Sequence, residues 1–153
     1  MYKPARESTG VSIMILDIFE IIEKVEKTNS KNEKVQILRQ NESWALKDVL
    51  KGTYDEKIEW LIPEGDPPYK EAAEESHPSS IHKIHRNFRY LVKGGPGTNM
   101  PQFKRERMFI SWLEGVHPED AKILLKMKDK KQLAKGLTIN LVEEAFPGLL
   151  GMR

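Results

Sequence analysis

Basic side chains that could bind a polyanion gather in two stretches in the second half of the sequence. The first, residues 82–107, holds seven Lys or Arg and a single acid, Glu106. These cations are Lys83, Arg86, Arg89, Lys93, Lys104, Arg105 and Arg107. In a helix, spacings of three and four place Arg86, Arg89 and Lys93 along one side, where they would suit a row of phosphates. The alternative is a solvated basic face without a ligand.

The second stretch leads through a loop into the last expected helix. Its lysines are offset by Asp129 alone before the chain reaches Gly136. They are Lys126, Lys128, Lys130, Lys131 and Lys135. Thr138 is expected to cap the helix that follows, and the free N–H groups of a helix start beside lysines form an anion site. Such a site holds a phosphate without reading base sequence.

Histidines offer a different chemistry. His82 and His85 are three residues apart, and together with His77 they could supply imidazole ligands to a metal ion. No carboxylate lies at a matching spacing, and Lys83 and Arg86 would repel a cation. We therefore interpret these histidines as surface or DNA-facing groups and expect no bound metal.

No catalytic signature accompanies these residues. The sequence has no Gly-x-x-x-x-Gly-Lys phosphate loop, no Gly-x-Gly-x-x-Gly and no Gly-x-Ser-x-Gly elbow. The glycine-rich residues 94–97 are better explained as a helix terminator than as a phosphate cradle. We expect a protein that is not an enzyme and needs no cofactor.

The composition fits one globular domain with an uneven charge. The chain has 153 residues, 39% hydrophobic and 31% charged, and no cysteine. No apolar run is long enough to cross a bilayer, and no segment resembles a secretory signal. Residues 1–76 carry 11 Lys/Arg and 16 Asp/Glu, a net charge of −5, whereas residues 77–153 carry 14 and 7, a net charge of +7. This asymmetry suggests a surface that faces a polyanion, and ordinary scatter of surface charge is the alternative.

Apolar spacing predicts an all-α, compact bundle of six to seven helices in a single domain of residues 13–150. Residues 1–12 and 151–153 are expected to be tails. Helices are expected over residues 13–27 and 79–93, and other helix starts are marked by Ser30 with Glu33, Ser43, Pro101, Pro118 beside His117, and Thr138. The proline-rich residues 58–76 should be irregular, with a short extended piece at their start. All three tryptophans are expected in the core.

Two stretches of the sequence together resemble a known family. The N-terminal stretch comprises Ile15 to Lys31, Ile37-Leu38, Asn41, Leu46-Lys47, Thr53-Tyr54 and Trp60. The C-terminal stretch comprises Pro118-Glu119-Asp120, Leu124-Leu125, Lys128-Asp129, Leu133, Gly136, Leu141-Val142, Ala145 and Phe146-Pro147-Gly148-Leu149-Leu150. In order and spacing they resemble the helical N-terminal DNA-binding domain of ATP-dependent DNA ligases, above all the short ligases of T-even-type phages. They are also similar to a family of stand-alone proteins from the same phages.

The resemblance implies a DNA-contacting face. In the ligases this domain lies across the minor groove of nicked duplex DNA and contacts phosphates and sugars, partly through the loop before the last helix and the start of that helix. The residues that this implies here are Lys128, Lys130, Lys131, Gly136, Leu137, Thr138 and Asn140. The sequence lacks the nucleotidyltransferase core of the ligases with its Lys-x-Asp-Gly motif, so we expect no nick sealing by this chain.

These observations predict a non-catalytic phage accessory protein that binds duplex DNA, intact or nicked, largely without sequence preference. It would act in replication, repair or DNA handling in the cytoplasm of the infected host cell. Two other classes stay open: a protein-interaction module that modifies a phage or host enzyme, such as a replication protein, and a structural component of the virion. In the first of these, the acidic face of the first helix, with Glu20, Glu23 and Glu26, would be the functional surface. An enzyme acting through His82 and His85 is the least favoured class.

Overall fold

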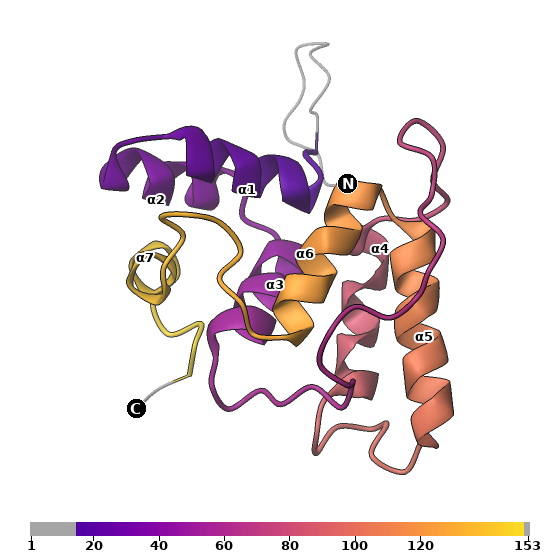
Figure 1. Cartoon of the computed structure of the whole chain (residues 1–153). Coiled ribbons are helices and arrows are strands. Elements are labelled where there is room, and N and C mark those ends of the chain that lie inside the picture. The colour runs from indigo at the N-terminus through magenta and orange to yellow at the C-terminus, as the bar shows by residue number, and fades with distance from the viewer. Residues whose placement is uncertain (1–14, 152–153) are drawn as a thin grey trace, which may run out of the picture.

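The computed structural model describes residues 15–151, and within that range the chain is all-helical (Figure 1). The elements in order are α1 (Ile18–Lys27), α2 (Lys31–Gln40), α3 (Trp44–Tyr54), α4 (Ile81–Ile84), the 3-10 helix η1 (His85–Leu91), α5 (Gln102–Gly115), α6 (Pro118–Lys128) and α7 (Ile139–Ala145). The predicted all-α bundle of six to seven helices is confirmed. The expected tail of residues 1–12, and residues 152–153 of the other tail, lie outside the described residues.

Hydroxyl side chains start three of the helices where the sequence predicts. Ser30, Ser43 and Thr138 each accept the backbone N–H three residues further on, at 3.3, 3.0 and 3.2 Å. Each satisfies one of the donors that a helix start leaves free. Pro118 occupies the first position of α6, where the missing N–H of proline costs nothing, and Pro101 lies just before α5. These starts are therefore confirmed to within one residue.

Helix α1 begins later than its apolar pattern predicts. Residues 15–17 are not helical, and Ile15 is 77% exposed. The backbone N–H of Asp17 donates to the carboxylate of Glu20 at 2.9 Å, and this contact marks the helix start. The expected helix over residues 13–27 is therefore wrong for residues 15–17, while residues 13 and 14 lie outside the described range.

The single helix expected over residues 79–93 is wrong, because two shorter elements, α4 and η1, take its place. Buried side chains in η1 recur every three residues, at His85, Phe88 and Leu91. A 3-10 helix has three residues per turn and so keeps this set on one line, which an α-helix does not. The spacing of the buried residues therefore explains why the chain tightens here.

Beyond η1 the chain pairs with the short extended piece that the sequence predicts. Trp60 and Val92 form an isolated antiparallel bridge. The N–H of Leu61 donates to the carbonyl of Leu91 at 2.7 Å. This pairing ends η1 and joins residues 58–62 to the helical core.

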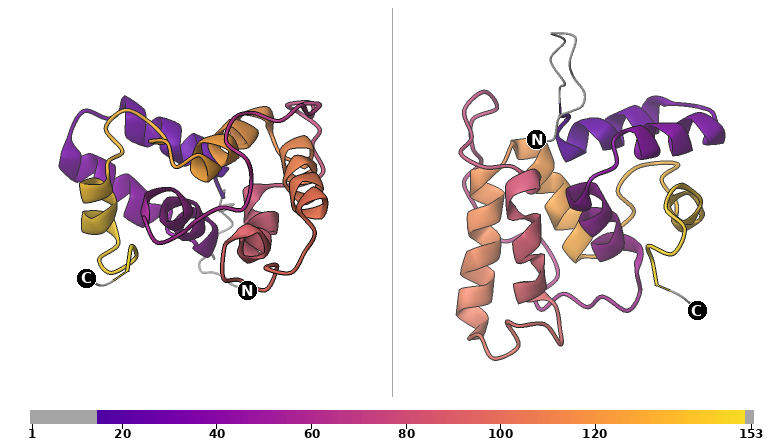
Figure 2. Two further views of the ribbon diagram at one scale, coloured as in Figure 1. Left: turned by 60° about the horizontal axis from the view of Figure 1, so that its bottom comes forward. Right: turned by 180° about the vertical axis from the view of Figure 1, so that it is seen from behind.

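Helix α6 lies at the centre of the molecule and packs against α1, α3 and α5. Helix α1 also pairs with α2, and α2 with α7, so α7 stands at one end of the bundle (Figure 1). Element η1 packs against α3 and α5 on the side away from α6 (Figure 2, right). One continuous cluster of buried apolar side chains includes members from all of these elements. None of the described helices combines the length and apolar character needed to cross a membrane.

A buried carboxyl group joins α6 to the start of α1. Asp120 is fully buried, and its Oδ1 accepts the backbone N–H of Phe19 at 2.9 Å, while its Oδ2 has no hydrogen-bond partner among the described residues. The ring of His117 stacks on that of Phe19 at 4.3 Å beside this contact. Burial raises the pKa of Asp120 to about 7, because the charged form loses its hydration.

Replacing Asp120 with Asn should flatten the pH dependence of stability. A carboxyl whose pKa is raised from 3.8 to about 7 binds more protons in the folded protein than in the unfolded chain. Its contribution is therefore greatest below the unfolded pKa and is lost as the pH rises to about 7, at a cost of up to about 4 kcal/mol. Asp120→Asn keeps an acceptor for the Phe19 N–H and should be the more stable protein at pH 8. Urea unfolding of both proteins from pH 4 to pH 8 checks this, and parallel curves would contradict it.

Candidate nucleic-acid interface

The structure turns Lys128, one of the expected phosphate contacts, into the protein. Its side chain is fully buried, with the ammonium 2.6 Å from Asp129 Oδ1. The same ammonium donates to the carbonyl of Gly65 at 2.6 Å and lies 6.0 Å from the centre of the Phe109 ring. The prediction that Lys128 contacts DNA is therefore wrong: this lysine fastens α6 to the proline-rich segment.

Two more lysines of this run bind the protein's own carbonyl groups. Lys130, at a φ of 59°, donates from its ammonium to the carbonyls of Gly52 at 3.0 Å and Asp55 at 2.6 Å. These carbonyls lie at the C-terminal end of α3, where a helix leaves acceptors unsatisfied. Burial of the Lys130 ammonium lowers its pKa. Lys126 likewise donates to the carbonyl of Leu133, at 3.3 Å. The expected phosphate-binding loop is thus partly a clamp on α3.

The remaining expected contacts of the loop lie at the surface or close to it. Lys131, Lys135, Thr138 and Asn140 are exposed. The Thr138 hydroxyl accepts the N–H of Leu141, which removes one of the donors that we expected to hold a phosphate. Leu137, also implied by the ligase resemblance, is fully buried, and the prediction that it contacts DNA is wrong.

Gly136 has a φ of 83°, a backbone conformation that side chains other than glycine rarely adopt. A Cβ added at Gly136 would lie 3.1 Å from the ammonium of Lys34. Gly136 therefore permits a tight turn next to a lysine from α2, a neighbour that the local sequence did not reveal.

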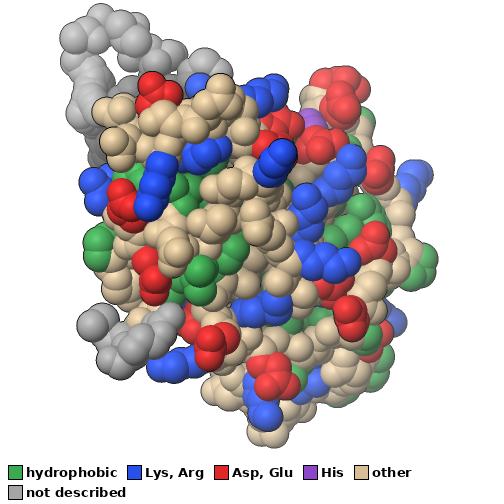
Figure 3. Space-filling model, turned by 60° about the vertical axis from the view of Figure 1, so that its left-hand side comes forward, with side chains coloured by type: hydrophobic (Ala, Val, Ile, Leu, Met, Phe, Trp, Pro, Cys, Tyr) green, Lys and Arg blue, Asp and Glu red, His purple; other side chains and the backbone are tan. Residues whose placement is uncertain are grey.

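Acidic side chains share this face of the molecule. A shallow hollow beside α1 and α6 is lined by Glu23, Glu26 and Asp66 as well as by Lys126 and Lys131. From the α7 side of the molecule, basic and acidic side chains are seen interspersed (Figure 3). Mixed charges weaken the attraction for a phosphate row, so this face is the weaker of the two candidates.

The other candidate begins on η1. Arg86 and Arg89 are exposed and three residues apart, so the 3-10 helix places them on the same side, as predicted for an α-helix. No described carboxylate pairs with either guanidinium, and that of Arg89 lies 5.4 Å from the centre of the Tyr90 ring. Lys93 lies past the end of η1, with its ammonium 3.8 Å from the Glu59 carboxylate. Two of the three cations of the predicted stripe are therefore brought together without a counter-charge.

Helix α5 adds two further exposed cations, Lys104 and Arg107. The guanidinium of Arg107 lies 5.7 Å from the centre of the Phe103 ring. Arg105, by contrast, turns inward and donates to the carbonyls of Gly97, at 3.3 and 3.2 Å, and Thr98, at 2.6 Å. Arg105 therefore holds the glycine-rich turn before α5, and its predicted role in DNA contact is not supported.

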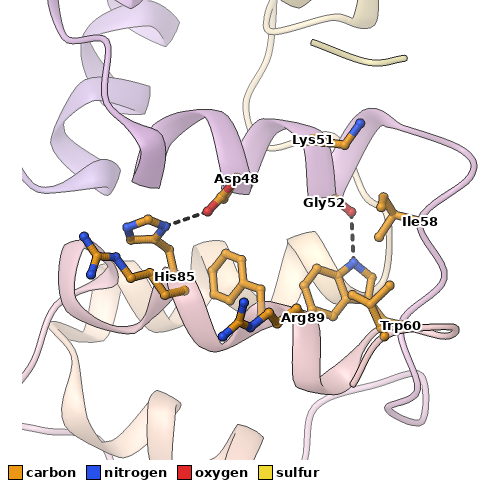
Figure 4. Close-up of a pocket in the computed structure, with 11 residues that line it drawn as sticks. Asp48, Lys51, Gly52, Ile58, Trp60, His85 and Arg89 are labelled. Carbon is orange, nitrogen blue, oxygen red and sulfur yellow. Dashed lines mark hydrogen bonds and ion pairs between the residues drawn. The ribbon is translucent and has the colours of Figure 1, made fainter. Parts of the chain in front are cut away.

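A cavity of about 460 Å³ lies between α3 and η1, next to Arg86 and Arg89 (Figure 4). Inside it, His85 Nδ1 lies 2.6 Å from Asp48 Oδ2. His85 is 9% exposed, so the interpretation of this histidine as a surface or DNA-facing group is wrong. Sequence reasoning missed Asp48 and the cavity, although the three-residue spacing of His85, Phe88 and Leu91 was a usable signal.

The other histidines bind backbone groups. His82 Nε2 lies 2.9 Å from the carbonyl oxygen of Leu16, and His77 Nδ1 lies 2.9 Å from that of Ser79. His117 Nδ1 accepts the N–H of Glu119 at 2.9 Å, which confirms its place at a helix start. Among residues 15–151, no three His, Asp or Glu side chains are arranged to hold a metal ion.

The tryptophans differ in environment. Trp60 and Trp112 are buried, as expected, but Trp44 is 73% exposed at the first position of α3. The ammonium of Lys47 lies 5.0 Å from the centre of the Trp44 ring and 5.5 Å from that of Phe146. The prediction that all three tryptophans are in the core is therefore wrong for Trp44.

Lys128→Ala should destabilise the fold strongly, because it leaves the nearly buried carboxylate of Asp129 without its ion pair. Breaking a buried pair from one side costs about 3–5 kcal/mol. Lys131→Ala removes a lysine from the exposed part of the same loop and should change stability by less than about 0.5 kcal/mol. Urea unfolding of both variants measures the difference, and equal effects would show that Lys128 is no structural anchor.

Comparison with known proteins identifies a family but no function. A search of curated proteins found no match. Residues 21–135, which include both basic stretches up to Lys135 and the whole α3–η1 cavity, match a family described as a family of unknown function, DUF6433. Because this match covers well over half of the sequence, the chain belongs to the DUF6433 family.

Proposed function

We propose that this protein binds duplex DNA non-catalytically, through phosphates, using an η1–α5 basic surface formed by Arg86, Arg89, Lys104 and Arg107. The observation that carries the proposal is that these four cations are exposed and are not paired with any described carboxylate. They lie on neighbouring elements, because η1 packs against α5 (Figure 2).

The chemistry of the surface favours DNA over a neutral ligand. Guanidinium and ammonium groups that neutralise phosphates release condensed counterions, a gain that does not depend on base sequence. Arginine adds planar hydrogen-bond donors that match phosphate oxygens two at a time. The resulting complex would be salt-sensitive and tolerant of sequence, as suits an accessory protein of phage replication, repair or DNA handling in the infected cell.

A protein partner is the second candidate function, and the exposed Trp44 favours it. Large aromatic side chains are enriched where proteins bind one another. Trp44 borders a hollow whose lining also includes Arg39, Phe146 and Leu149. Trp44→Ala should leave DNA binding unchanged, whereas it should weaken capture of a phage or host enzyme if this face is the functional one. Retention of protein from infected-cell lysate on immobilised wild type and on this variant distinguishes the two functions.

Removing charge from the η1–α5 basic surface should weaken DNA binding and its salt dependence. Arg86→Gln/Arg89→Gln and Lys104→Gln/Arg107→Gln each remove two cations, so each should lower the affinity for a closed circular duplex about tenfold and the salt slope by about two. All four side chains are exposed, so the fold should not change. Fluorescence titration of labelled DNA at several salt concentrations gives both quantities.

The matched control is Lys131→Gln/Lys135→Gln, which removes the same charge from the mixed face. This variant should bind DNA like the wild type. If it loses as much affinity as the other two, the interface lies on residues 126–140 instead. If the wild type binds no duplex even at low salt, the proposed function is wrong.

A further inference from the structure

The cavity between α3 and η1 combines an apolar wall with a cationic rim. Its wall includes Ile58, Trp60, Phe88 and Val92, and Arg86 and Arg89 line it as well. In Figure 4, Trp60 and Ile58 lie at one end of the space between the two helices, and His85 and Asp48 lie at the other. A cavity of about 460 Å³ is within the size range of small-molecule sites, which are largely apolar with a few polar groups.

The rim has two guanidinium groups that the protein leaves without a counter-charge. Arg86 and Arg89 are one 3-10 turn apart, or about 6 Å along the axis. Of the other charged groups of the lining, Lys51 is paired with Asp55 Oδ2 at 2.8 Å and also donates to the carbonyl of Leu149 at 3.1 Å, and Asp48 is hydrogen-bonded to His85. The unpaired groups therefore select an anion, and their planar donors fit a phosphate.

The wall is fixed in place by contacts within the protein. The indole N–H of Trp60 donates to the carbonyl of Gly52 at 2.9 Å, so its polar group is already satisfied. A Cβ at position 52 would lie 2.7 Å from Trp60 Cζ2, so glycine is needed for this close approach. The rings of Trp60 and Phe88 meet edge to face, 5.7 Å between centres. What the wall offers a ligand is a preformed apolar and aromatic surface.

We propose that this cavity binds a single nucleotide, with its phosphate at Arg86 and Arg89 and its base against Ile58, Phe88 and Val92. Asp48 has one carboxylate oxygen that His85 does not use, and this oxygen can accept an N–H or O–H from the base or the sugar. The nucleotide is either free in solution or at the end of a DNA strand, since a base paired within a duplex cannot enter. Binding of a strand end rests on the proposed DNA binding, because both use Arg86 and Arg89.

Calorimetric titration with adenosine monophosphate tests the site, with adenosine and inorganic phosphate as partial ligands. We expect one mononucleotide per chain and clearly weaker binding of either part. Arg86→Gln/Arg89→Gln should weaken the mononucleotide at least about tenfold, since charge-assisted hydrogen bonds are lost. Lys104→Gln/Arg107→Gln removes the same charge outside the cavity and should change this affinity less than twofold. No binding at millimolar mononucleotide, or equal losses in the two variants, overturns the proposal.

Ile58→Trp tests the apolar wall, since it reduces the cavity and keeps both arginines. It should weaken binding of the mononucleotide and leave the binding of closed circular DNA unchanged. Unchanged mononucleotide binding would show that the base does not lie in the cavity. If circular dichroism shows that this variant is unfolded, the partial ligands provide the test instead. Adenosine that binds as tightly as adenosine monophosphate would show that the arginines do not bind its phosphate. Inorganic phosphate that binds as tightly as the mononucleotide would show that the apolar wall does not contribute to binding.

Linear and closed circular duplexes distinguish the two sources of the nucleotide. A strand end in the cavity predicts tighter binding of the linear DNA, and mononucleotide should compete away the difference. Equal binding of both DNAs together with saturable mononucleotide binding assigns the site to free nucleotide. If the protein binds circular DNA but no mononucleotide, the proposed DNA-binding surface stands and only the cavity proposal is overturned.

Discussion

The three-residue repeat of buried side chains along η1 is the constraint on which the proposed DNA-binding surface depends. Because His85, Phe88 and Leu91 are buried together against the neighbouring helices, the chain winds as a 3-10 helix, and Arg86 and Arg89 share a line of their own. An α-helix would offset the two guanidinium groups by about 60°. The packing of the core thus sets the placement of charge at the surface, on a rigid element rather than on a loop.

Local signals in the sequence were sufficient for much of the fold. Helix starts at Ser30, Ser43 and Thr138 follow from a side chain and a backbone donor three residues apart, so nothing distant is needed to predict them. The apolar pattern of α1 continues upstream of the Asp17–Glu20 contact that starts the helix, so the pattern alone places the start too early. In η1 the period of three competes with a period near 3.6, and the sequence pattern fits both.

Counting charged residues along the sequence does not show which of them are available to a ligand. The sequence places Lys128 and Lys130 in a basic run, but their carbonyl acceptors lie on Gly65 and Gly52, 63 and 78 residues away. A lysine has a long apolar stem, so a distant unsatisfied carbonyl can draw its ammonium inward. His85 likewise has a partner that is distant in the sequence, Asp48, which lies 37 residues away. Only exposure and pairing, both properties of the fold, separate the cations that hold the protein together from those free to meet a ligand.

The carbonyl of Gly52 accepts hydrogen bonds from two other parts of the chain, one 8 and the other 78 residues away. It lies in the last turn of α3, accepts the indole N–H of Trp60 on the cavity wall and accepts the ammonium of Lys130 from the loop before α7. Local opening of that loop would remove one of the two donors from this carbonyl and leave the bond from Trp60. If opening of the loop shifts the wall, then by thermodynamic reciprocity a ligand bound against the wall would protect the amides of the loop from hydrogen exchange. The cavity wall and the loop before α7 therefore share one hydrogen-bond acceptor, which is a physical route by which a change in one can affect the other.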